Sequence, residues 1–178
     1  MHDAGTFWPP ALDPDGARLD GYGFRAVIEA PRQTLISGAV EAGLAALRPG
    51  LAAQGPYAII DDDTYAVRLG IDRVLLVSPA IGALREASAW DAAGYASSDL
   101  GEALVMITLT GPAAFDVLAR GGGVDLRAPA PASGGAAMMR HAEITLIAYR
   151  YRDGLRLHVE RPSLSYLWEL LGAYAEIL

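Results

Sequence analysis

The chain has 178 residues, of which 52% are hydrophobic and 20% are charged, a composition typical of one folded domain and not of a disordered chain. Its 21 acidic residues outnumber 14 basic ones, and the formal net charge of −7 argues against a nucleic-acid partner bound through phosphate contacts. No apolar stretch reaches the roughly 18–20 residues of a membrane span and no secretory signal is visible, so we expect a cytoplasmic protein without a membrane partner.

Residues 1–20 carry three prolines and four aspartates without hydrophobic periodicity. We expect an irregular N-terminal arm, followed by one domain over residues 21–178. Phe7 and Trp8 are large apolar residues that a free tail does not need. They are predicted to anchor the arm to its own domain or to another chain.

The first half of the domain alternates short apolar runs with turn residues. Thr34 is predicted to cap a helix, because apolar residues follow it at helical spacing until Pro49-Gly50. The elements expected in this half are a strand at Tyr22–Glu29, the helix from Thr34 (Ile36, Val40, Leu44, Leu47), strands at Tyr57–Ile60, Tyr65–Ile71 and Val74–Val77, and a helix from Ser78-Pro79 to about Trp90.

The second half begins with Ala103–Leu109, which is apolar at nearly every position, as in a strand covered on both faces. Gly111-Pro112 is predicted to start a helix that Gly121 ends. The remaining expected elements are a loop from Gly121 to Gly135, strands at Ala137–His141, Ile144–Tyr151 and Leu155–Glu160, and a helix from Pro162 to the C-terminus.

Two segments about half a chain length apart share one pattern. Asp72–Pro79 and Asp153–Pro162 each read as a turn, a strand, a proline and a helix. The repetition predicts an α+β fold with a duplicated β/α half, about residues 21–92 and 93–178. Both halves are expected to pack into one mixed, mostly antiparallel sheet with flanking helices.

Groups able to carry catalysis are few. The chain has no cysteine and no lysine, which excludes disulfides, thiolate metal sites and Schiff-base chemistry. His158 shares a strand face with Arg156 and Glu160, and the pattern favours a surface pair over a catalytic base. His141 lies at a hairpin end without a recognisable partner. We therefore predict no catalytic, cofactor-binding or metal-binding residue in this chain.

The C-terminal helix has two apolar stripes, where the surface helix of a monomer needs one. The second stripe is predicted to meet another subunit, although burial against a local element is the alternative. Arg150 and Arg152 share one side of a strand and either pair with nearby acids or form a basic patch for an acidic partner. The first stripe is Leu164, Leu167, Trp168, Leu171, Ala175 and Leu178, and the second is Tyr166, Leu170, Tyr174 and Ile177.

Several segments, in order, resemble the gamma subunit of heterotetrameric sarcosine oxidase. They are Ala66–Val77, Asp99-Leu100-Gly101-Glu102, Val105–Gly121, Val124-Asp125-Leu126 and Ser165–Leu171, and the similarity covers about residues 57–178. The structural motif residues that the resemblance assigns are Asp99, Gly111, Pro112, Leu118 and Asp125.

The resemblance implies a fold related to the folate-binding domain of glycine-cleavage aminomethyltransferases. It also implies a complex that oxidatively demethylates sarcosine or a related N-methyl amino acid, with alpha, beta and delta-type subunits as partners. FAD, FMN, NAD, tetrahydrofolate and zinc would be bound by those partners, and this chain would be a structural, cofactor-free subunit. In the transferases an acid positions the folate, whereas this chain has Gly134–Met139 without an acid, so that role does not carry over.

One further departure concerns the helix end, where the gamma family has lysine-glycine-cysteine and this chain has Arg120-Gly121-Gly122. The difference leaves open a relative that acts on another N-methylated substrate. Two alternatives of other classes remain: a stand-alone tetrahydrofolate-binding, aminomethyltransferase-like protein using Asp99 and Arg150, and a homodimeric structural module.

Overall fold

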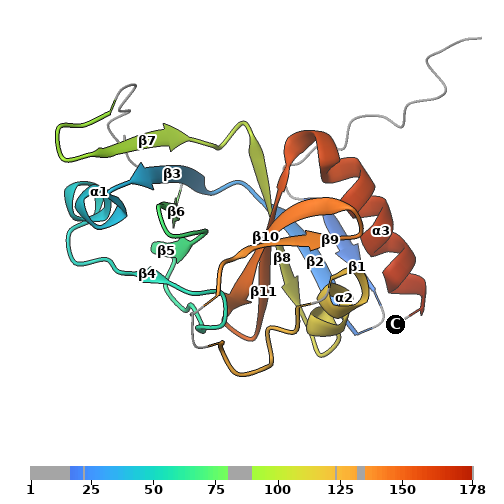
Figure 1. Ribbon diagram of the computed structural model, residues 1–178. Helices are drawn as coiled ribbons and strands as arrows, with labels where there is room; N and C mark the ends of the chain where they lie inside the picture. Colours follow the sequence, from blue (N-terminus) through green and yellow to red (C-terminus); the bar gives the residue numbers. More distant parts are fainter. Residues whose placement is uncertain (1–16, 22, 80–89, 123, 132–134, 178) are drawn as a thin grey trace, which may run out of the picture.

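The computed structural model describes residues 17–21, 23–79, 90–122, 124–131 and 135–177. In these residues the strands form two sheets that lie beside each other, with two helices on the larger and one on the smaller (Figure 1). Most of the expected arm, with Phe7 and Trp8, lies outside the described residues, as does most of the helix expected after Ser78. No helix in the described part of the chain is long and apolar enough to cross a membrane.

The larger sheet has six strands in the order β1-β2-β8-β11-β10-β9, and every neighbouring pair is antiparallel. Its strands are β1 (Arg18–Asp20), β2 (Arg25–Glu29), β8 (Leu104–Thr110), β9 (Met138–His141), β10 (Ile144–Tyr151) and β11 (Gly154–Glu160). Helices α2 (Ala114–Gly121) and α3 (Leu164–Ile177) cover this sheet, and a 3-10 turn at Arg161–Ser163 leads into α3.

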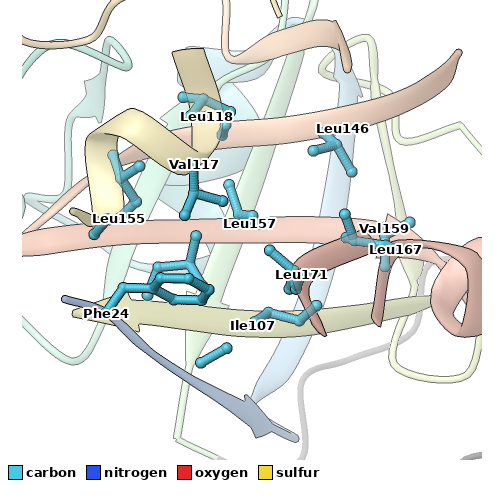
Figure 2. Close-up of a cluster of buried hydrophobic side chains, with 14 of the residues drawn as sticks. Phe24, Ile107, Val117, Leu118, Leu146, Leu155, Leu157, Val159, Leu167 and Leu171 are labelled. Atoms are coloured by element: carbon cyan, nitrogen blue, oxygen red, sulfur yellow. The ribbon is translucent and has the colours of Figure 1, made fainter. Parts of the chain in front are cut away.

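The main hydrophobic core lies between this sheet and its two helices (Figure 2). Val117 and Leu118 of α2 and Leu167 and Leu171 of α3 are each at most 1% exposed. They pack on apolar strand residues such as Leu157 of β11. The burial of an apolar face in this way is what stabilises a helix against a sheet.

The smaller sheet has five strands in the order β4-β5-β6-β3-β7. Among the described strands of this sheet, the β4–β5 pair is parallel and the other three pairs are antiparallel. The strands are β3 (Arg32–Gly38), β4 (Ala53–Gln54), β5 (Tyr65–Arg68), β6 (Arg73–Ser78) and β7 (Tyr95–Asp99), and helix α1 (Val40–Leu47) packs on them through Val40 and Leu44.

The predicted α+β class with mostly antiparallel pairing is confirmed, but the strands form two sheets where one was expected. A separate core cluster joins the sheets, with Val67 and Leu75 from the smaller and Met106 and Ile147 from the larger. Strand membership also crosses the expected midpoint of the chain, because β1 and β2 belong to the larger sheet and β7 to the smaller.

Two local predictions were wrong. Thr34 does not cap a helix: it lies within β3, which is paired on both sides by β6 and β7. The helix begins only at Val40, after Gly38 turns the chain with a φ of +92°. Tyr57–Ile60 is not a strand, and only Ile60 forms an isolated parallel bridge, to Tyr151. At Thr34, strand pairing with distant segments outweighed the local helical periodicity, whereas residues 57–59 lack a partner strand within the described residues.

Candidate functional site

Three of the expected motif residues lie in α2 or in the turn just before it. Gly111 has a φ of +104°, and a Cβ atom there would lie 2.6 Å from the carbonyl oxygen of Gly23. Glycine is therefore required at this turn. Pro112 follows it just before α2 begins, and Leu118 on that helix is 1% exposed within the main core.

The two motif aspartates hold turns. Asp99 Oδ1 accepts a hydrogen bond from the backbone N–H of Gly101 at 2.9 Å, and its Oδ2 lies 3.4 Å from an Nη2 of Arg32. Asp125 accepts bonds from the backbone and side chain of Arg127, at 2.9 and 3.0 Å. Both aspartates therefore stabilise turns at the protein surface.

Those residues predicted to meet a partner that the structure describes lie on α3 and on and beside β10. On α3, Tyr166 and Ile177 are exposed by 48% and 63%, whereas Leu170 and Tyr174 are half-buried. The ring of Tyr174 packs edge-on against the imidazole of His141, with the ring centroids 6.3 Å apart. The middle of the second stripe is thus partly buried within the chain, and the residues at its two ends are exposed.

The two arginines of the expected basic patch have separate surroundings. Arg150 is half-buried, with its guanidinium over the Phe115 ring. Arg152 is exposed and forms an ion pair of 2.9 Å with Asp63. Asp99 lies on an edge strand of the other sheet from Arg150 and has its own partners, so the structure shows no shared contact between these two residues.

A row of buried polar side chains crosses the space between the two sheets, and the sequence did not reveal it. We call it the buried network: Gln33, Tyr65, Tyr149, Arg156 and His158, of which none is more than 8% exposed. Gln33 and Tyr65 come from β3 and β5 of the smaller sheet, and the other three come from β10 and β11 of the larger. The expected surface pair at His158 was therefore wrong, because the helices cover one face of β11 and the smaller sheet the other.

The hydrogen bonds of the buried network form a continuous line. Arg156 Nη1 lies 2.7 Å from the hydroxyl of Tyr65, which lies 2.7 Å from that of Tyr149. The Tyr149 hydroxyl lies 2.7 Å from Nε2 of His158, whose Nδ1 bonds to Oε1 of Gln33. The Gln33 amide donates in turn to the backbone carbonyl of Leu104, at 3.0 Å.

The two ends of this line fix the role of every atom within it. The Gln33 amide nitrogen donates to a carbonyl, so the Gln33 oxygen must accept from Nδ1–H of His158. Neutral imidazole then accepts at Nε2 from Tyr149, and Tyr149 accepts from Tyr65. Arg156, which only donates, completes the line at Tyr65.

Burial keeps the histidine and the two tyrosines of the line in the neutral forms that this pattern needs. It lowers the pKa of His158 to about 3, and the charge of Arg156 acts in the same direction. Burial also raises the pKa of the Tyr65 and Tyr149 hydroxyls. The line thus joins the two sheets through satisfied hydrogen bonds and leaves no ionised base or nucleophile in it.

We expect the free energy of unfolding to fall as the pH drops from about 6.5 toward 3, by up to about 1.4 kcal/mol per pH unit, through His158. In this range the unfolded chain binds a proton that the folded chain excludes. Burial lowers the pKa of His141 too, so it adds in the same direction. Urea unfolding between about pH 5 and 7.5 measures the slope. His158→Gln should reduce it, and an unchanged slope would contradict the assignment.

The described residues contain no group of three or more histidine, cysteine or acidic side chains placed to hold a metal ion. By sequence, no family model and no curated protein matches the chain. By structure, it matches a chain of heterotetrameric sarcosine oxidase from Corynebacterium sp. U-96, determined in complex with pyrrole 2-carboxylate. The TM-score is 0.62 at 19% sequence identity, and the match covers 94% of this chain and 94% of that chain. The predicted resemblance is confirmed at the level of the fold.

Proposed function

We propose that the chain is a non-catalytic, gamma-type subunit of a sarcosine-oxidase-like complex that oxidatively demethylates sarcosine or a related N-methyl amino acid. The observation that carries the proposal is the match over 94% of both chains to one chain of a heterotetrameric sarcosine oxidase. Because the two coverages are equal, the matched chain is about as long as this one. The likeness is therefore to a whole chain of that assembly, and not to a domain of a longer chain.

The buried network supports a structural role. Its histidine and both tyrosines bond to one another, and Gln33 ends the line at a backbone carbonyl. A general base must be able to reach a substrate proton, and His158 is 1% exposed. In this proposal the partner subunits, of alpha, beta and delta type, hold FAD, FMN, NAD, tetrahydrofolate and zinc, and the assembly is cytoplasmic.

The proposal is tested by purifying the chain with an affinity tag from its native host. The expected result is a stoichiometric complex that shows flavin absorbance and demethylates sarcosine or another N-methyl amino acid, while the chain expressed alone turns over none of them. Recovery of the tagged chain as a monomer without a flavoprotein would contradict the proposal, as would sarcosine turnover by the chain alone.

Within such a complex we expect Ile177→Glu to reduce the yield of assembled complex about tenfold or more, without unfolding the chain. Ile177 ends the second stripe of α3 and is 63% exposed, so a charge there costs the folded monomer little. Ile71→Glu is the matched control, because Ile71 is 93% exposed on the turn between β5 and β6. Equal yields of complex from the two variants would remove this helix end from the interface.

A further inference from the structure

A cavity of about 390 Å³ opens beside Arg156, at the junction of the two sheets. Its apolar lining includes Pro31, Val77 and Pro79, and the acidic residues Glu29 and Asp63 line it as well. Arg156 is the basic residue of this lining, and its side chain is 9% exposed. A hollow of this size with apolar walls and one fixed charge is the usual form of a small-molecule site.

Some N–H groups of the Arg156 guanidinium have no acceptor in the described part of the chain. Of its five N–H groups, one on Nη1 donates to Tyr65, one on Nη2 to Glu29, and Nε–H points to the Thr108 hydroxyl 3.4 Å away. Within the described part of the chain, no acceptor is bonded to the second N–H of Nη1 or of Nη2. One hydrogen on each terminal nitrogen therefore remains for an acceptor in the cavity.

The charge of Arg156 is incompletely matched. A buried cation is costly unless an anion and hydrogen bonds compensate it. The anion here is Glu29, which makes one contact of 3.2 Å and whose side chain is 37% exposed. The Tyr151 ring, whose centroid lies 3.4 Å from the guanidinium carbon, adds cation–π attraction but no negative charge. The preferred partner of a guanidinium is a carboxylate bound through two hydrogen bonds, which Glu29 does not provide.

We propose that this cavity binds the carboxylate group of a small apolar acid, with Arg156 as its anchor. The incoming carboxylate takes the unused N–H groups. Glu29 opposes it through its negative charge and is exposed enough to turn into solvent, so it leaves Arg156 when the acid binds. Asp63 does not oppose this anion strongly, because Arg152 neutralises it at 2.9 Å. The apolar part of the acid lies against Pro31 and Val77. The site is separate from the proposed subunit role and can be tested without any partner.

The test titrates the full chain with benzoate and with benzylamine, which share a ring and differ in charge, and follows the Val77 methyl signals by NMR. We expect saturable shifts with benzoate only. Glu29→Ala should tighten benzoate binding about twofold to fivefold, because it removes the competing carboxylate. Arg156→Met should abolish binding, and Arg161→Met, an exposed arginine at a neighbouring hollow, should not change it.

Three results would overturn the proposal: the absence of saturable shifts with benzoate, equal shifts with benzylamine, or weaker benzoate binding in Glu29→Ala. Glu29→Ala removes a partly exposed carboxylate and no core atom, so we expect it to fold. It therefore tests the proposal even if Arg156→Met does not fold. None of these results bears on the subunit proposal, which rests on the purified complex.

Discussion

Replacement of Tyr149 by phenylalanine is expected to lower the free energy of unfolding by about 2–4 kcal/mol. The substitution keeps the ring and removes one hydroxyl, but that hydroxyl joins Tyr65 to His158. Nε2 of His158 then has no donor, and the Tyr65 hydroxyl keeps only the weak sulfur acceptor of Met106, at 4.0 Å. Both groups are buried. An unsatisfied buried polar group costs about 1–3 kcal/mol, and a domain is stable by only about 5–15 kcal/mol.

Tyr166→Phe is the matched control for this experiment. The Tyr166 hydroxyl also makes a hydrogen bond, at 3.1 Å to the carbonyl of Ala142, but the residue is 48% exposed and water can replace the bond. We expect it to change the stability by less than about 0.5 kcal/mol. Urea unfolding followed by circular dichroism measures both variants. Equal losses would show that the buried network adds nothing beyond an ordinary surface hydrogen bond.

The burial of this network was not predicted from the sequence, although the strand that carries part of it was. Strand β11 was predicted at nearly its observed bounds, and its alternation correctly placed His158 and Arg156 on one face. That face was taken to be exposed because it carries charge, whereas the smaller sheet covers it. The sequence signal that could have shown this is the length of the apolar run in β10, which includes Tyr149 and implies cover on both faces.

Local patterns predicted the elements that depend mainly on local sequence. Strands β8 to β11, α2 and the buried stripe of α3 lie where the hydrophobic periodicity placed them, whereas β7 was not predicted. The helix predicted from Thr34 was wrong because β3 pairs with two strands, β6 and β7, that lie far along the chain. The division into two sheets also depends on long-range pairing, which periodicity does not encode.

We expect Gly154→Ala to lower the free energy of unfolding by about 3 kcal/mol or more. Gly154 begins β11, and a Cβ atom there would lie 2.0 Å from the carbonyl oxygen of Leu109 on β8. That oxygen is backbone, so no side chain can turn away, and the two strands must separate at this end. The similar segment earlier in the chain has Arg73 at the corresponding strand start, where the residue is exposed. The repeated pattern therefore does not extend to the packing.

Gly172→Ala tests whether the loss comes from this contact or from glycine replacement in general. Gly172 lies within α3, and a Cβ atom there would have nothing within 4 Å. Alanine favours a helix over glycine by up to about 1 kcal/mol, so this variant should be as stable as the natural chain or more so. One chemical change is thus expected to act with opposite sign at two glycines, and thermal or urea unfolding measures both. Since β11 also carries Arg156 and His158, a stable Gly154→Ala protein would mean that β8 and β11 are not held in the register on which the buried network and the cavity depend.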